Sequence, residues 1–409
     1  MKNRLLKSSL GFLFSNVIYL SIPFLMMPYL TRELSVEDYG NIGIFQTICV
    51  LAVSVFSLSA PSYTLRAHFD KNKRDISIIN SYFTSILFFC FGFPLVYILI
   101  VCLTDIDTDI ILLALLVSVP TNIINVYLAK KQAEKDIKNY AYIQVGLSLA
   151  NMSFSFIFVM FLYENYLGRV SGIALAYTIF SLVVVFIFLR NGHLDFRGIN
   201  KSQLFDNFDF GIRLLPHAIG AFMISYYDRI YITNKFETNE FGLYFLAVQL
   251  SSILGVLLDS FHKANVSYSY NLLANDRKED WIKHRNKLFF ILFVLSIMIF
   301  VFNNTILDFV VVLFVGEKFS GAVEFLKILL YIQIIRGCYL SVTVALGFYR
   351  RNLTQSVITL ASGILSVVLM FLFSDIYGIV GVVYASLASI TSLFILTFIF
   401  QNRIIKRNV

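Results

Sequence analysis

The chain has 409 residues, of which 58% are hydrophobic and only 14% are charged, and its mean hydropathy is +0.76. These values exclude a water-soluble globular protein, in which about a quarter of the residues carry a charge. The formal net charge of +8 would suit a nucleic-acid partner, but the basic residues are distributed as in the loops of a membrane protein, so none is expected. The four cysteines lie in or beside apolar runs without a CxxC pair, so we expect neither a metal site nor a cofactor.

Apolar segments long enough to cross a bilayer recur along the whole chain. About 20 helical residues at 1.5 Å each are needed to span a hydrocarbon core of roughly 30 Å. We predict twelve spans, at residues 10–30, 40–63, 79–103, 110–129, 140–163, 168–189, 210–233, 241–262, 288–314, 322–346, 354–373 and 378–401. The predicted fold class is therefore an all-α polytopic membrane protein.

The first span and the turn after it recur halfway along the chain. Asp38-Tyr39-Gly40 follows the first span and Glu240-Phe241-Gly242 follows the seventh, so that position 38 corresponds to position 240. Because a repeat of this length fixes the architecture, we predict two related six-helix bundles, residues 1–200 and 201–409.

Lysine and arginine alternate between crowded and sparse loops. Of the 33 basic residues, 25 lie in one set of loops and at the two ends of the chain. The sparse set contains Arg32, Arg169, Lys235, Lys318 and Lys327. Since basic loops stay in the cytoplasm, both termini and the long 263–287 loop are predicted inside, with 31–39, 104–109 and 234–240 outside.

Ionisable residues inside the spans are the first candidates for function, because each costs about 2.5–3.5 kcal/mol at the bilayer centre. At 100° per residue, Arg213, His217 and Asp228 of the seventh span share a stripe about 60° wide, allowing for a kink at Pro216. Arg336 lies near the middle of the tenth span, far from either surface. A functional role is therefore favoured for Arg336 over a purely structural one.

Several of these residues have structural alternatives. Asp228 and Arg229 can form an ion pair that only fixes helix packing, and this is as well supported as a transport role. Asp259 is expected to be solvated or paired with Lys263, four residues further on. Asp308 has no obvious partner in the sequence and is a candidate ion site in the outer leaflet.

Prolines and small residues suggest where helices bend and where they pack closely. Pro23 and Pro28 of the first span and Pro216 of the seventh are hinge candidates, and ordinary kinks are the alternative for each. The Gly168-x-x-x-Gly172 motif is interpreted as close helix packing, as is the line of small and polar residues at 355–366.

Three runs resemble segments of the Wzx-type flippases, which move O-antigen and capsule repeat units. The first-helix signature is matched by NVIYLSIPFLMMPYLTRELSVEDYGNIGIFQT, and the seventh helix with its Asp-Arg pair by FGIRLLPHAIGAFMISYYDRIYI. The outer loop between helices nine and ten is matched by VLFVGEKFSGAVEFLKILL. The resemblance implies the multidrug/oligosaccharidyl-lipid/polysaccharide exporter fold, in which two bundles form a MATE-like V around a central cavity.

By this resemblance the chain is expected to be a transporter of the bacterial inner membrane and not an enzyme. Its substrate would be an undecaprenyl-pyrophosphate-linked glycan, moved at the expense of an H⁺ or Na⁺ gradient. A polymerase and a chain-length regulator of the same pathway would be its partners. Arginine is a natural phosphate ligand. The expected substrate contacts are Arg336, Arg213, His217, Arg229 and Asn16, and the ion-coupling candidates are Asp228 and Asp308.

Two other functions compete with a flippase. A multidrug or metabolite antiporter of the same fold would bind cations, for which unpaired acids in the first bundle are expected. The first-bundle spans of this chain contain no obvious buried acid, which counts against this function. A polysaccharide polymerase or ligase would need a large external loop for its chemistry. No predicted external loop exceeds about ten residues, which is the length of an ordinary connection between helices, so this function ranks last.

Overall fold

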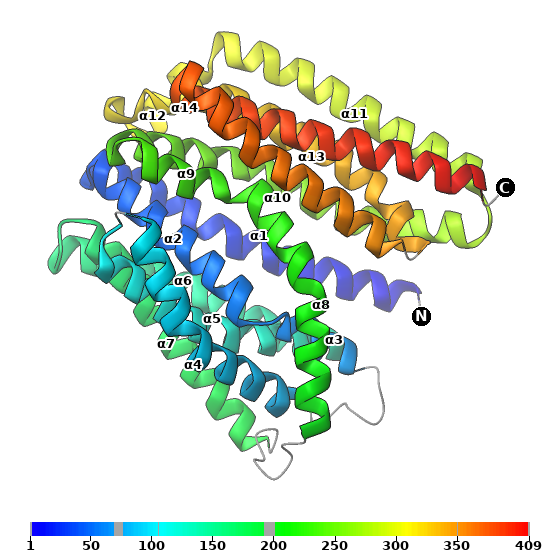
Figure 1. The fold of residues 1–409 in the computed structure, drawn as a ribbon, viewed down its shortest axis with the longest axis horizontal. Coiled ribbons are helices and arrows are strands. Elements are labelled where there is room, and N and C mark those ends of the chain that lie inside the picture. Colours follow the sequence, from blue (N-terminus) through cyan, green and yellow to red (C-terminus); the bar gives the residue numbers. More distant parts are fainter. Residues whose placement is uncertain (1, 69–76, 105, 192–200, 350, 408–409) are drawn as a thin grey trace. The chain divides into compact units, whose positions relative to one another are not determined.

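The computed structural model describes residues 2–68, 77–104, 106–191, 201–349 and 351–407, which are almost entirely helical (Figure 1). The side chains of Pro216 and His217 lie outside this description. The elements are α1 (Lys2–Glu33), α2 (Val36–Phe56), α3 (Ala60–Ala67), α4 (Ser77–Leu103), α5 (Thr108–Glu134), α6 (Ile137–Phe161), α7 (Tyr166–Arg190), α8 (Lys201–Ser225), α9 (Tyr227–Lys235), α10 (Thr238–Ala274), α11 (Lys278–Thr305), α12 (Leu307–Val315), the 3₁₀ turn η2 (Glu317–Phe319), α13 (Ala322–Phe348) and α14 (Asn352–Arg407).

The chain forms two compact units, Met1–Ala218 and Ile219–Val409, called unit 1 and unit 2 below. Helix α8 begins in unit 1 and ends in unit 2. The boundary that the repeat places between residues 200 and 201 stays a prediction.

The repeated sequence motif marks helix starts in both units. Ser35 caps α2 and forms a capping box with Asp38: the Ser35 Oγ accepts from the Asp38 amide at 3.0 Å, and the Asp38 carboxylate accepts from the Ser35 amide at 3.2 Å. Asp38 also accepts a hydrogen bond from the Tyr166 amide at 3.0 Å, which ties the start of α2 to the start of α7. The counterpart Glu240 lies in the first turn of α10. The repeat therefore preserves an acid where a helix dipole favours one.

The second predicted span, 40–63, is not one helix. α2 ends at Phe56 and α3 begins at Ala60, because Leu58 (φ 44°) and Ser59 (φ 57°) adopt left-handed backbone conformations between them. Gly211 of α8 lies so close to the Leu58 carbonyl that a Cβ at this position would collide with it. The break is thus covered by a helix that only glycine allows to approach.

Close packing of α6 against α7 confirms the interpretation of the Gly168-x-x-x-Gly172 motif. A Cβ at Gly172 would lie 2.6 Å from the Ser155 Cα, and one at Gly168 would lie 3.0 Å from the Val159 Cα. These helices carry the main core of unit 1 together with α5, in which Tyr127 packs against other buried side chains.

Unit 2 is built around α13, which packs against α10, α11 and α14. One apolar cluster, centred on Ile334, joins α13 to α10 and α11, and a second, which includes Ile335, joins it to α8 and α14. The small residues of α14 pack closely as predicted, since a Cβ at Gly363 would lie 3.0 Å from the Gly220 carbonyl oxygen.

Ten helices of the described residues are long and apolar enough to cross a membrane, and α14 counts once among them. α14 is two helices that meet at Gly378 (φ 60°, ψ −141°), and Figure 1 shows its orange and red halves running back alongside each other. The two last predicted spans are therefore confirmed as separate helices. The predicted seventh span is absent from the ten, because 210–233 is divided between α8 and the polar helix α9.

The long loop predicted at 263–287 is mostly helical. α10 runs to Ala274 and α11 starts at Lys278, so α10 alone, with 37 residues, is about 55 Å long and exceeds the bilayer core. A small core lies at this end of unit 2 and joins α10, α11, α13 and α14. Its buried members are Leu272, Leu273, Trp281, Ala345 and Ile405.

Candidate functional site

The central arginine of unit 2 pairs with an acid on the neighbouring helix. Arg336 of α13 donates from Nη2 to the Asp259 Oδ2 of α10 at 2.7 Å, and from Nη1 to the Gln333 Oε1 at 3.4 Å. Asp259 was expected to be solvated or paired with Lys263; its side chain is 32% exposed, but the predicted partner is wrong. The reason is that α10 and α13 share the largest helix interface of unit 2, which sequence distance does not reveal.

The packing of α13 explains why Arg336 lies on this face. Ile334 and Ile335 enter the two apolar clusters, so positions 333 and 336 fall on the remaining side of the helix, which faces α10. On α10 the opposing residue is Gly255. A Cβ there would lie 2.6 Å from the Gln333 Oε1 and 3.2 Å from the Arg336 Nη1. A glycine at this position therefore makes room for both polar side chains.

The Arg336–Asp259 pair is accessible, and this property distinguishes it from a structural ion pair. The side chains are 42% and 32% exposed, respectively. A guanidinium has five N–H donors, and the described residues accept from two of them, at Asp259 and Gln333, which leaves three for a further acceptor. A phosphate oxygen is the acceptor that such a planar fork binds best.

A second charged pair, between neighbouring residues of α9, has the opposite character. Arg229 Nη1 lies 3.3 Å from the Asp228 Oδ1, the two side chains are only 10% and 9% exposed, and Tyr244 donates its hydroxyl hydrogen to the Asp228 Oδ2. Arg229 also lies over the Tyr226 ring, 4.7 Å from its centroid. These contacts fit the alternative of an ion pair that fixes packing.

The stripe predicted for the seventh span is not formed by one continuous helix. α8 ends at Ser225 and α9 begins at Tyr227, so the angular relation between Arg213 and Asp228 fails at the break. Arg213 is 77% exposed and pairs with Asp209 in its own helix at 2.9 Å. His217 and Pro216 lie outside the described side chains, so their predicted roles stay predictions.

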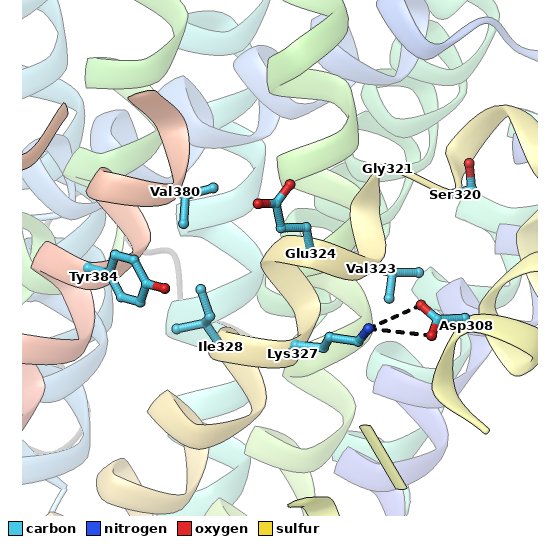
Figure 2. Close-up of a pocket in the computed structure, with 9 residues that line it drawn as sticks. All are labelled: Asp308, Ser320, Gly321, Val323, Glu324, Lys327, Ile328, Val380 and Tyr384. Carbon is cyan, nitrogen blue, oxygen red and sulfur yellow. Dashed lines mark hydrogen bonds and ion pairs between the residues drawn. The ribbon is translucent and has the colours of Figure 1, made fainter. Parts of the chain in front are cut away.

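Asp308, which has no obvious partner in the sequence, has one in the structure. The Lys327 Nζ lies 3.2 Å from the Asp308 Oδ1 and 3.4 Å from its Oδ2 (Figure 2). The pair joins α12 to α13, and its side chains are exposed (70% for Asp308). An unpaired ion site at Asp308 is therefore not what the structure shows.

The candidates of the first span are held within unit 1. The Asn16 Oδ1 accepts from the Tyr140 hydroxyl at 3.0 Å and from the Gln144 Nε2 at 2.8 Å, which ties α1 to α6. Pro23 and Pro28 lie inside α1, which continues from Lys2 to Glu33 without an assigned break. Their hinge role stays a prediction.

Arg169 is a buried cation, although the sequence places it in a predicted outer loop. It lies in the first turns of α7, is 6% exposed, and donates from Nη1 to the Asn151 Oδ1 at 2.6 Å and to the Ser155 Oγ. Its position between the two packing glycines, Gly168 and Gly172, is the sequence signal that places it inside. No group of three or more His, Cys, Asp or Glu side chains within the described part of the chain is arranged to hold a metal ion.

The chain is similar to proteins of known family and fold. Residues 5–266 match the family model of polysaccharide biosynthesis proteins. A protein of the Lsg locus of Haemophilus influenzae is 28% identical over 358 residues, which cover 85% of this chain and 86% of that protein.

Solved structures of transporters have the same fold. An inward-facing multidrug resistance MATE transporter of the MOP superfamily matches with a TM-score of 0.72 at 15% identity, over 98% of this chain and 95% of its own. A MOP superfamily transporter from Pyrococcus furiosus, whose binding pocket has reversed polarity, matches with a TM-score of 0.66 at 15% identity, over 98% and 96% of the two chains. The all-α fold predicted from the sequence is thus confirmed as that of MATE transporters.

Proposed function

Because the chain belongs to the polysaccharide biosynthesis protein family and has a MATE transporter fold, we propose that it is a flippase for lipid-linked glycans. It moves a polyprenyl-pyrophosphate-linked oligosaccharide across the bacterial inner membrane by alternating access. The product supplies synthesis of O-antigen, capsule or exopolysaccharide. Family and fold are both those of transporters, and family membership agrees with the resemblance to Wzx-type proteins.

The observation that carries this proposal is the accessible Arg336 on α13. The Asp259 carboxylate accepts from one Nη2 donor of Arg336, at 2.7 Å. A (pyro)phosphate can therefore bind bidentately through other donors of the same guanidinium. A fully buried pair such as Asp228–Arg229 would lose several kcal/mol if one partner were drawn away. The half-exposed pair can exchange partners at lower cost, as a transport cycle requires.

The same pair supplies a route to ion coupling. A substrate phosphate and the Asp259 carboxylate attract the same guanidinium, so binding of the phosphate weakens the ion pair and opens the carboxylate to a coupling cation, H⁺ or Na⁺. Asp259 thereby joins Asp228 and Asp308 as a coupling candidate. It is favoured over them because it alone of the three contacts Arg336. Arg213 stays a proposed second basic contact.

Complementation of a flippase-null strain tests the proposal, with surface glycan and membrane protein abundance measured together. Arg336→Ala should abolish surface glycan at normal abundance, and Arg336→Lys should lose most of it, because lysine cannot form the bidentate contact. The matched control is Arg277→Ala, which removes an exposed Arg–Asp pair of similar length (2.8 Å, to Asp280) at the start of α11.

Two results would contradict the proposal. Normal export by an abundant Arg336→Ala protein would exclude a substrate role. Low abundance of Arg336→Ala that Asp259→Asn restores in the double variant would show that the pair only holds α10 to α13. If instead the chain protects cells from toxic cations and leaves glycan unchanged, it is a multidrug antiporter of this fold.

The orientation in the membrane is part of the proposal: both termini lie in the cytoplasm, as does the α10–α11 turn. In a variant without the native cysteines, an impermeant thiol reagent should label Asn239→Cys in intact cells and spare Asn275→Cys until the membrane is opened. Both positions are exposed in the structure. Labelling of Asn275→Cys in intact cells would invert the topology. A polymerase and a chain-length regulator stay the proposed partners.

A further inference from the structure

A polar pocket of about 460 Å³ opens at the N-terminal end of α13, between α12, α13 and α14 (Figure 2). Lys327 turns toward Asp308 on one side, and the Tyr384 hydroxyl of α14 faces α13 from the other. Glu324 lies one turn before Lys327 and is exposed. Among the described residues, none donates a hydrogen bond to the Glu324 carboxylate. The pocket lining therefore contains a free acceptor in addition to an ion pair.

The charges of the pocket define which headgroup it suits. Two carboxylates, Asp308 and Glu324, and one ammonium, that of Lys327, line the pocket, so these three side chains give it a net charge of −1. A pyrophosphate brings several negative charges and no cation, so it is repelled here. A group with one phosphate and one ammonium matches both signs: the phosphate meets Lys327 and the ammonium meets Glu324.

An apolar groove continues from the pocket along α14. It has a volume of about 520 Å³ and shares Tyr384 with the polar pocket. The other lining residues are Leu387, Ala388, Thr391, Ser392, Ile395 and Leu396. The helical rise from Tyr384 to Leu396 is about 18 Å, close to the depth of one leaflet, which is half of a core of roughly 30 Å. Tyr384 marks the junction, as amphipathic rings do at membrane interfaces.

We propose that this pocket and groove bind one phospholipid with a phosphoethanolamine headgroup, with one of its two acyl chains lying along α14. The site is separate from the proposed glycan site: Lys327 and Arg336 are nine residues apart on α13, which places them on opposite faces of that helix at 100° per residue. The bound lipid bridges α12, α13 and α14 at the membrane surface. The primary ammonium of this headgroup donates charged hydrogen bonds to a carboxylate. A glycerol headgroup carries no positive charge and can donate only neutral ones.

Native mass spectrometry of the purified full-length protein tests the site, with phosphatidylethanolamine and phosphatidylglycerol of identical acyl chains as probes. The wild type should retain phosphatidylethanolamine about tenfold more strongly, the size expected from one charge-assisted hydrogen bond. Glu324→Gln should remove most of this preference. Ala388→Leu, which fills the groove, should weaken retention of both lipids.

Matched controls separate the site from general effects of charge and bulk. Glu317→Gln removes an exposed carboxylate of η2 that does not line the pocket, and Ile376→Phe enlarges an exposed apolar side chain of α14 outside the groove. Both should behave as the wild type. Equal retention of the two lipids by the wild type, or unchanged retention in Glu324→Gln and Ala388→Leu, would overturn the proposal and leave Lys327–Asp308 as a surface ion pair.

Discussion

Replacing Gly255 by alanine is the most selective perturbation that the structure offers, because it displaces the side chains of Gln333 and Arg336 without removing a charged group. The added Cβ would lie 2.6 Å from the Gln333 Oε1, and an ordinary contact starts at 3.4 Å, so the amide must retreat by about 0.8 Å. The Arg336 Nη1, at 3.2 Å, must move by a few tenths of an ångström. Both atoms end flexible side chains, so the backbone can stay in place.

The expected result is a loss of transport with little change in stability. Alanine gains about 1 kcal/mol over glycine in a helix, which offsets the cost of moving the two side chains. A displacement near 1 Å at a reacting or binding group costs up to a hundredfold in rate, so we expect glycan export to fall about tenfold at normal protein abundance. The assay is surface glycan per unit of membrane-inserted protein in a flippase-null strain.

Two further variants make the test of Gly255→Ala specific. Gln333→Ala removes the closest obstacle, so adding it to Gly255→Ala should recover export to the level of Gln333→Ala alone. Gly172→Ala places its Cβ 2.6 Å from the Ser155 Cα, which is backbone and cannot retreat, so that variant should lose abundance by overpacking. Normal export by Gly255→Ala would refute the assignment of this face to the substrate.

Three other predictions concern stability and movement. Arg229→Ala should lower the thermal midpoint in detergent by the equivalent of about 3–5 kcal/mol, because it leaves the Asp228 charge buried, and adding Asp228→Asn should restore part of the loss. Partial burial raises the pKa of Asp136, but hydrogen bonds from the next turn and an adjacent lysine outweigh it and hold that pKa below its ordinary value. This stabilisation is present above pH about 4 and lost as the pH falls through the folded-state pKa, so Asp136→Asn should flatten the acid side of a pH–stability profile. Replacing Pro23 and Pro28 by alanine should slow export at normal abundance, and export at the normal rate would remove the hinge hypothesis.

Hydropathy was enough to predict the fold class and nearly all of the spans, because lipid imposes one length on every crossing helix. It does not reveal where a span is broken. The break after α2 depends on left-handed Leu58 and Ser59, and neither residue type signals this conformation. The seventh span, predicted as one helix, is divided at Tyr226, which separates α8 from α9.

For the candidate site, the sequence pointed to Arg336 but not to the residue that pairs with it. A central arginine is visible in the sequence because its insertion cost demands an explanation, and Arg336 was selected on that ground. Its partner Asp259 lies 77 residues away on a helix whose register against α13 depends on side-chain packing. The same limit hid the Lys327–Asp308 pair, because α12 is a short helix that the sequence merges into a longer span.

The small core at the end of α10 gives this protein a built-in optical probe. Trp281 is the only tryptophan in the chain and is 1% exposed among residues of α10, α11, α13 and α14. Its emission therefore reports the integrity of this small core of unit 2. A denaturation followed by fluorescence and by helical circular dichroism should give separate transitions if the two units melt independently, and no label needs to be introduced.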